Sequence, residues 1–246
     1  GMETIDIPYA ESKGIACLNS PEGNRDAVGE QAIGALLSLL NNLKKANREV
    51  QSLIWDREGN RGVELKEKVV GIIGYGNMGS AFAKKLSGFE VATIAYDKYK
   101  TQYSDQYVKE TTLDEIFERA DVLSIHVPQT PETIYMVNDS FLSKFKKPII
   151  VINTARGKVV KTDDLVKHMK QQTVYGAILD VLEYESFNFQ DFLTNDMPEA
   201  FTYLANSDRA ILTPHVAGWT FESKVKLSSI LADKIIERYK NKMKPS

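Results

Sequence analysis

Short apolar runs alternate with amphipathic stretches along the chain from residue 68 onward, and this alternation limits the possible folds more than any other feature. The runs have the composition of buried strands, and the stretches between them carry apolar residues at the three- and four-residue spacings of helices. The predicted strands cover residues 69–74, 91–96, 122–127, 148–153, 174–179 and 210–213, and the predicted helices cover residues 78–87, 113–120, 139–145 and 162–170. This alternation predicts an α/β fold with one doubly wound parallel sheet.

The two ends of the chain follow another pattern. Residues 14–18 are predicted as an isolated strand, and turn-forming residues follow it. Residues 27–55 are predicted as one helix, which is long for a globular domain, and residues 223–239 form a further amphipathic stretch. Because a helix of that length usually bridges two bodies, we expect both ends of the chain to form a layer outside the main sheet.

The charge and cysteine content exclude several classes of protein. The 246 residues include 31 Lys and Arg against 33 Asp and Glu, so no net positive charge is present to hold a nucleic acid or an anionic membrane. The single cysteine, Cys17, excludes an internal disulfide framework and a cysteine-based zinc site. No apolar stretch approaches the roughly 20 residues that span a bilayer, and no signal-peptide pattern opens the chain. We therefore expect a cytoplasmic protein with no metal, nucleic-acid or membrane site.

A glycine-rich motif lies between the first predicted strand and the first predicted helix. In Gly74-Tyr75-Gly76-Asn77-Met78-Gly79, the first glycine permits a tight turn, the second lets a pyrophosphate approach the backbone, and the third lets helix pack on strand. Asp97 ends the next predicted strand, where a carboxylate would accept hydrogen bonds from the adenosine ribose and repel a 2′-phosphate. Together these features predict an NAD site that discriminates against NADP. The alternative is a glycine-rich turn beside a solvated aspartate that binds no ligand.

Further polar residues follow the later predicted strands, at the edge where open α/β sheets bind ligands. Arg156 follows the fourth strand and could clamp a carboxylate with two parallel hydrogen bonds, although an arginine taken alone is more often a surface ion-pair partner. Asp180, Glu183 and Glu185 follow the fifth strand, where acidic residues are usually solvated, and His215 follows the sixth. A histidine paired with a carboxylate can act as general acid and base near neutral pH, and Glu185 could supply that carboxylate.

The other two histidines have less favourable positions for chemistry. His168 lies in the middle of a charged predicted helix and is expected to be exposed. His126 lies in the apolar third strand and is expected to support the core or a loop. His215 is therefore the candidate for proton transfer.

Taken together, these motifs resemble the D-isomer-specific 2-hydroxyacid dehydrogenase family, and within it the phosphoglycerate dehydrogenases. The resemblance covers essentially the whole chain, and its motifs occur in family order. They are residues 13–21, the glycine motif, Ile125-His126-Val127-Pro128 followed by Thr130-Pro131-Glu132-Thr133, Asn153-Thr154-Ala155-Arg156-Gly157, Leu179-Asp180-Val181 and Thr213-Pro214-His215-Val216-Ala217-Gly218.

The resemblance implies reversible, NAD-dependent oxidation of a D-2-hydroxyacid to its 2-oxoacid, with 3-phosphoglycerate as the first candidate substrate. Arg156 would bind the substrate's carboxylate and carbonyl, His215 would exchange the hydroxyl proton, and Glu185 would hold the imidazole. The resemblance also implies a homodimer that pairs through residues 27–55.

The resemblance further implies a set of contacts with NAD. Asn77 and Met78 would contact the pyrophosphate and Asp97 the ribose, while Thr154, Asp180 and others would surround the nicotinamide half. The complete predicted set is Gly74, Gly76, Asn77, Met78, Gly79, Asp97, Pro128, Thr133, Thr154, Ala155, Asp180, Ala217 and Gly218.

The sequence departs from the family pattern at three places. Ser186 stands where the family usually has proline after the catalytic glutamate, so the choice of Glu185 over Glu183 rests on spacing alone. The loop at residues 183–209 is longer and more aromatic than expected, as a lid or an interface would be. Gln31 replaces a histidine that is frequent in relatives, a change with little expected effect on the chemistry.

Family members carry part of a flavodoxin-like substrate-binding domain before the point where this chain begins. We therefore expect residues 1–27 to be a remnant of that domain and residues 28–219 to form a Rossmann-like NAD-binding domain. Residues 220–246 are expected to return toward the substrate domain as a helix. A chain of this extent is expected to bind NAD without turning over substrate.

Two other functions are compatible with these motifs. An NAD-sensing, corepressor-like interaction protein would share the fold without turnover, and the three catalytic candidates do not exclude it. A formate dehydrogenase is disfavoured, because those relatives have an amide in place of the carboxylate partner of the histidine. Reduction of 2-oxoacids by NADH distinguishes the dehydrogenase from the interaction protein.

Overall fold

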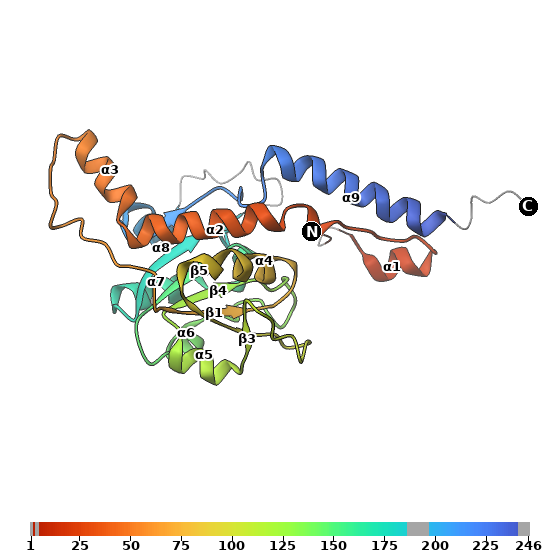
Figure 1. Ribbon diagram of the computed structural model, residues 1–246, viewed down its shortest axis with the longest axis horizontal. Helices are drawn as coiled ribbons and strands as arrows, with labels where there is room; N and C mark the ends of the chain where they lie inside the picture. The colour runs from red at the N-terminus through yellow and green to blue at the C-terminus, as the bar shows by residue number, and fades with distance from the viewer. Residues whose placement is uncertain (1, 3–4, 186–196, 241–246) are drawn as a thin grey trace, which may run out of the picture.

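The computed structural model describes residues 2, 5–185 and 197–240, and within them a seven-stranded parallel sheet forms the centre of the molecule (Figure 1). Its strands are β1 (Val69–Ile73), β2 (Ala92–Tyr96), β3 (Lys109–Glu110), β4 (Val122–Ile125), β5 (Ile149–Asn153), β6 (Val174–Leu179) and β7 (Ala210–Leu212). They lie in the order β3-β2-β1-β4-β5-β6-β7, and every neighbouring pair is parallel. The predicted doubly wound α/β fold is confirmed, and the direction of winding reverses between β1 and β4, where such folds bind ligands.

Helices cover both faces of this sheet. The helices of the described residues are α1 (Ile7–Ser12), α2 (Arg25–Leu40), α3 (Leu43–Gln51), α4 (Asn77–Leu86), α5 (Leu113–Arg119), α6 (Asp139–Leu142), α7 (Thr162–Lys170), α8 (Glu199–Asn206) and α9 (Phe221–Tyr239), of which α2 and α4 pack on one face and α5 to α8 on the other. Val70 and Ile72 of β1 pack with Phe82 of α4 and with residues of α2, whereas Ile73 packs with Ile116 of α5 and with residues of α6, α7 and α8. This two-residue alternation divides the interior into one core on each face of the sheet.

The single helix predicted over residues 27–55 is wrong, because the chain forms two helices there. Helix α2 ends at Leu40, and Asn42 has φ +52° in the left-handed region before α3 begins at Leu43. Asparagine tolerates this conformation better than other residues with a side chain, and the Asn42 amide also donates to the carbonyl of Arg61 at 3.1 Å. The break lets α3 point away from the sheet (Figure 1).

The strand predicted at residues 14–18 is also wrong, because this segment has no strand partner among the described residues. The residues that directly follow it, 19–23, lie beside α9. Lys234 donates to the carbonyl of Asn19 at 2.9 Å and pairs with Glu22, and the Ser20 hydroxyl donates to the carbonyl of Leu227 at 2.8 Å. Figure 1 shows α1 and α9 together on one side of the molecule, beyond the sheet.

Part of the loop predicted at residues 183–209 is helical, because α8 occupies Glu199–Asn206 and packs Leu204 into the core. Ser186 and the aromatic residues at 187, 189 and 192 lie outside the described residues. Among the helices that are described, none is long and apolar enough to cross a membrane.

Candidate active site

The glycine motif forms a tight turn between β1 and α4, and its three glycines differ in what surrounds them. Gly74 has φ +93°, and a Cβ there would lie 2.5 Å from the carbonyl oxygen of His126. A Cβ at Gly79 would lie 2.1 Å from the carbonyl oxygen of Gly74, so this position requires glycine for packing. Gly76 faces open space at the N-terminus of α4. Of the three glycines, Gly76 alone therefore leaves open space beside the backbone, where an anion could approach the N-terminus of α4.

Tyr75 holds this turn in place through its buried side chain, a role that the sequence did not predict. Its side chain is buried, its hydroxyl donates to Asp105 at 2.8 Å, and its ring stacks on Tyr103 with the centroids 5.3 Å apart. Lys100 donates to the carbonyl of Tyr75 at 2.8 Å. Burial, with the Asp105 carboxylate second, raises the pKa of Tyr75 well above its ordinary range, so the hydroxyl stays protonated and keeps donating.

Asp97 lies directly beside the glycine turn and holds it. Its Oδ2 accepts from the backbone N–H of Tyr75 at 2.8 Å, and its Oδ1 accepts from the N–H groups of Tyr99 and Lys100 at 2.9 and 3.1 Å. A carboxylate offers about four acceptor positions, so capacity remains for a ribose hydroxyl. Asp97 therefore has a structural role and keeps acceptor capacity for the predicted ribose contact.

The loop after β4 approaches the same turn. Thr133 donates to the carbonyl of Pro128 at 2.6 Å and fixes this loop. His126 precedes it, with Nε2 placed 2.8 Å from the Ser124 hydroxyl and the ring 5.5 Å from that of Phe82. Its Nδ1 is buried and has no partner among the described residues, and burial lowers the pKa of His126 to about 4. His126 is therefore neutral near pH 7, and its interior position is as predicted, although one ring nitrogen lacks a partner among the described residues.

The turn after β5 positions Arg156. The buried Asn153 side chain accepts from the N–H of Ala155 and donates to the carbonyl of Arg156, both at 3.0 Å. The Arg156 guanidinium is half-buried and donates to the carbonyl of Ala155 at 2.6 Å. A Cβ at Gly157 would lie 2.0 Å from the carbonyl oxygen of Leu182, so this turn packs tightly against the loop after β6.

That neighbouring loop brings a carboxylate to His215. Glu185 Oε2 lies 2.9 Å from His215 Nδ1, and Glu185 Oε1 accepts from the N–H of Leu182. Glu183 points elsewhere and accepts from the N–H of Thr162 at 3.3 Å, and burial raises the pKa of its carboxyl group. Of the two glutamates, the structure places against the imidazole Glu185, the one that spacing favours.

Asp180 fixes the loop that carries His215. Its carboxylate is 1% exposed and accepts from the Thr213 hydroxyl at 2.5 Å and from the N–H groups of Val216 and Ala217, both at 2.9 Å. These bonds hold His215 at φ +56°, a conformation that residues with a side chain rarely adopt. The described contacts thus give Asp180 a positioning role beside its predicted contact with the nicotinamide half.

Two residues of the α2 region also contact this loop. The Gln31 amide donates to the Thr213 hydroxyl at 3.0 Å, and its Oε1 is buried with no partner among the described residues. A Cβ at Gly218 would lie 2.4 Å from the Asn24 amide, which explains the glycine by packing. The sequence predicts little effect of Gln31 on the chemistry, because a single polar residue on a helix shows no sign of its distant partner.

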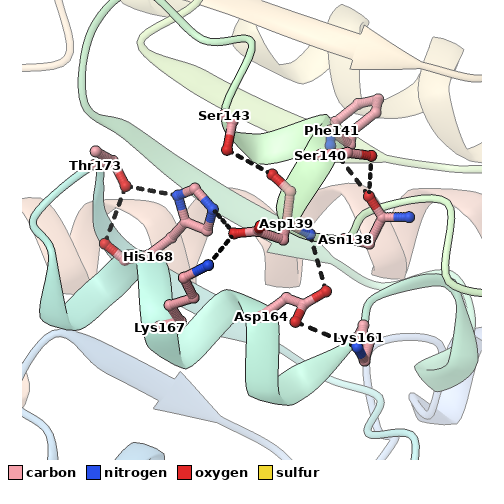
Figure 2. Close-up of polar contacts among 10 residues, drawn as sticks. All are labelled: Asn138, Asp139, Ser140, Phe141, Ser143, Lys161, Asp164, Lys167, His168 and Thr173. Carbon is pink, nitrogen blue, oxygen red and sulfur yellow. Dashed lines mark hydrogen bonds and ion pairs between the residues drawn. The ribbon is translucent and has the colours of Figure 1, made fainter.

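The prediction that His168 is exposed is wrong. Figure 2 shows its ring enclosed between the end of α7 and the start of α6, with Nδ1 2.7 Å from the Thr173 hydroxyl and Nε2 3.0 Å from Asp139 Oδ1. Lys167 donates to the same Asp139 oxygen at 2.8 Å, and the Asp139 N–H donates to Asp164 at 2.9 Å. Thr173 directly precedes β6, so this network lies at the sheet edge opposite the glycine turn and stabilises the fold.

The residues at the carboxyl ends of the strands fit a dinucleotide. The Thr154 hydroxyl at the end of β5 is buried and has no partner among the described residues, as expected for a group that a ligand would satisfy. Gly76 leaves room for a pyrophosphate at the N-terminus of α4, and Asp97 stands at the end of β2. No group of three or more His, Cys, Asp or Glu within the described ranges is placed to hold a metal ion.

Comparisons with known proteins agree with this geometry. Residues 33–217 match the family described as D-isomer specific 2-hydroxyacid dehydrogenase, NAD binding domain. The whole chain is 36% identical to a glyoxylate reductase of Thermofilum pendens and spans 71% of that protein. Over 98% of its length, the chain is 33% identical to a D-3-phosphoglycerate dehydrogenase of Archaeoglobus fulgidus and spans 44% of that protein. A crystal structure of D-lactate dehydrogenase from Aquifex aeolicus with NAD and lactic acid superposes with a TM-score of 0.86, at 30% identity, over the whole chain and 78% of that protein. The chain therefore belongs to the D-isomer specific 2-hydroxyacid dehydrogenase family, and residues 33–217 are its NAD-binding domain.

Proposed function

We propose that the protein is an oxidoreductase that transfers a hydride between C2 of a D-2-hydroxyacid and NAD. The observation that carries the proposal is the 2.9 Å contact between Glu185 and His215, on a loop packed against the turn that bears Arg156. All three side chains belong to segments that leave the carboxyl ends of β5, β6 and β7, the edge that also holds the glycine turn. When bound, NAD supplies the hydride chemistry, and the protein supplies orientation and charge.

His215 and Glu185 would exchange the proton. A proton on His215 Nδ1, directed at Glu185 Oε2, fixes the tautomer and leaves Nε2 as the nitrogen that faces proton exchange with the substrate hydroxyl. In the oxidation direction, Nε2 accepts the hydroxyl proton as C2 loses its hydride, and the Glu185 carboxylate stabilises the imidazolium that forms. In the reduction direction, the same imidazolium returns the proton to the carbonyl oxygen.

Arg156 would orient the substrate. A guanidinium presents parallel N–H donors that match a carboxylate, and one further donor can polarise a neighbouring carbonyl oxygen. The amide of Asn153, which bonds the backbone of Ala155 and of Arg156, holds the turn from which the guanidinium extends. Arg156 would therefore select for a carboxylate next to the reacting carbon.

The substrate would be a small 2-hydroxyacid or 2-oxoacid, with 3-phosphoglycerate as first candidate. The names of the relatives include glyoxylate reductase, hydroxypyruvate reductase and D-3-phosphoglycerate dehydrogenase. The acids in these names share the carboxylate and the reacting carbon that Arg156 and His215 would contact. They differ in the group attached beyond the reacting carbon. A panel of glyoxylate, hydroxypyruvate and 3-phosphohydroxypyruvate with NADH therefore tests the proposal and the substrate together.

We expect residues 1–246 to bind NADH but to reduce these acids at least about 100-fold more slowly than a longer relative, because positioning accounts for several kcal/mol of such a barrier. The chain spans 71% and 74% of two of its curated relatives, so parts that they possess have no counterpart in these residues. The measurement is NADH oxidation, with the Thermofilum pendens enzyme as positive control.

A chimera that adds the part of that relative which these residues do not span is the matched variant. We expect turnover to appear in the chimera. Equal kcat/KM for residues 1–246 and the chimera would contradict the expectation that the added part matters. NADH binding without turnover in either form would instead favour the NAD-sensing interaction protein.

We also propose a homodimer that forms through α3 and the segment after it. No residue of α3 is buried, and Leu53 and Trp55 are 95% and 86% exposed where this region extends from the sheet (Figure 1). Apolar side chains exposed together in this way mark association surfaces. Light scattering at micromolar concentration should give twice the chain mass, and Leu53→Glu with Trp55→Glu should give a monomer. Ile236→Glu on α9 is the control, and a monomeric wild type would refute the proposal.

A further inference from the structure

An ion pair connects the two loops that flank the adenosine side of the dinucleotide site. Lys98 Nζ lies 2.6 Å from Glu132 Oε2, and the Tyr99 hydroxyl donates to the same oxygen at 3.0 Å. Lys98 and Tyr99 follow Asp97 at the end of β2, whereas Glu132 lies in the loop after β4. Since β2 and β4 are the strands on either side of β1, this contact spans the position of the glycine turn.

The ion pair between Lys98 and Glu132 affects which cationic side chains are available to a phosphate on the ribose. Sites that accept a 2′-phosphate place a cationic side chain near the end of the second strand. Two lysines follow Asp97, and both are engaged: Lys100 donates to the carbonyl of Tyr75 at 2.8 Å, and Lys98 donates to Glu132. The hydrogen bond from Lys98 lowers the pKa of Glu132, so the carboxylate remains charged at neutral pH. The pair therefore presents no net positive charge to the ribose.

Substituting Asp97 cannot by itself show which residue determines the choice between NAD and NADP. Its carboxylate accepts three backbone hydrogen bonds, one of them from Tyr75 in the glycine turn. Replacing Asp97 is expected to disturb that turn and weaken binding of both cofactors. A second residue that acts on the 2′-phosphate through charge, without touching the turn, is needed to separate the two effects.

We infer that Glu132 is a specificity-determining residue for NAD over NADP. By pairing with Lys98, the residue that follows Asp97, it withholds that cation from a 2′-phosphate, and it adds a second carboxylate, bonded by the Tyr99 hydroxyl, to this pair of loops. The inference rests on the NAD-binding domain and does not depend on the proposed reaction. It concerns binding, so it can be tested on residues 1–246 without turnover.

The test is titration of NADH and NADPH, followed by cofactor fluorescence, on the wild type, Glu132→Gln, Lys98→Met and the double variant. Glu132→Gln is expected to tighten NADPH binding about three- to ten-fold and to change NADH binding less than about two-fold, as expected for one charge a few ångströms from the phosphate. The gain should shrink in high salt, because both groups are exposed. In the double variant, which lacks the freed cation, most of the gain should disappear.

Four outcomes would overturn the inference. Unchanged NADPH affinity in Glu132→Gln would show that Lys98 does not reach the phosphate. An equal gain for NADH would indicate a general change in the site, and a full gain in the double variant would exclude Lys98 as the cation. A wild type that binds neither cofactor would reject the inference together with the cofactor assignment, whereas NADH binding without turnover would affect only the proposed reaction.

Discussion

Replacing His215 with alanine is expected to lower kcat/KM at least about 100-fold in any form of the protein that reduces a 2-oxoacid, the scale of general acid–base catalysis. The variant loses the imidazole that would deliver the proton, while the glycine turn and Asp97 are untouched. NADH affinity should therefore stay close to that of the wild type. Steady-state kinetics and NADH titration on the same preparation separate the two effects.

Arg156→Lys and Glu185→Gln extend this test. Lysine keeps the charge but lacks the planar fork, so the first variant should lose a similar factor, mainly through KM for the acid. Glu185→Gln keeps the size of the side chain and removes the charge beside His215, and kcat should fall. Glu183→Gln is the matched control, because Glu183 bonds the backbone of Thr162 and does not contact the imidazole. A larger loss in Glu183→Gln than in Glu185→Gln would reassign the catalytic carboxylate.

Acidification is expected to destabilise the protein through His126. The pKa of His126 is about 4 in the folded chain, below its ordinary value of 6.5. The unfolded chain therefore takes up a proton between these values while the folded chain does not. Stability contributed by the neutral ring is complete above pH 6.5 and is lost as the pH falls toward 4, by about 3 kcal/mol in all.

His126→Gln is the variant that isolates this effect. Glutamine can still bond the Ser124 hydroxyl but does not titrate, so the carboxyl groups elsewhere contribute equally to both proteins. Denaturant unfolding from pH 7 to pH 4 should show a steeper loss of stability in the wild type. Parallel pH profiles for the two proteins would mean that His126 takes up a proton as readily in the folded chain as in the unfolded chain.

Sequence patterns predicted the strands and helices whose apolar side chains recur at regular spacing. The predictions failed where contacts with distant segments determine the local structure or the burial of a side chain. The six longer strands follow from apolar runs, whereas the two residues of β3 are too few to form a pattern. The break at Asn42 leaves the apolar spacing on either side intact, so the pattern continued across it. His168 lies on a charged helix, and only the approach of α6 buries it against Asp139.

The candidate site shows the same division. The glycine motif and Asp97 could be placed from local sequence, because each has a known position relative to its own strand. Tyr75, Gln31 and Glu132 act on residues from other segments, and their partners lie 30, 182 and 34 positions away. No periodicity encodes such distances, since only the winding of the sheet brings those segments together.

The packing of Gly157 against the Leu182 carbonyl has a consequence for engineering. Because there is no room for even a methyl group between them, the turn that bears Arg156 and the loop that bears Glu185 cannot move apart or together independently. A library of variants for new substrates should leave positions 157 and 182 unchanged. It should vary the protein residues that would face the part of the substrate beyond the reacting carbon. Within such a library, the handedness of the product is expected to persist while the preferred chain length changes.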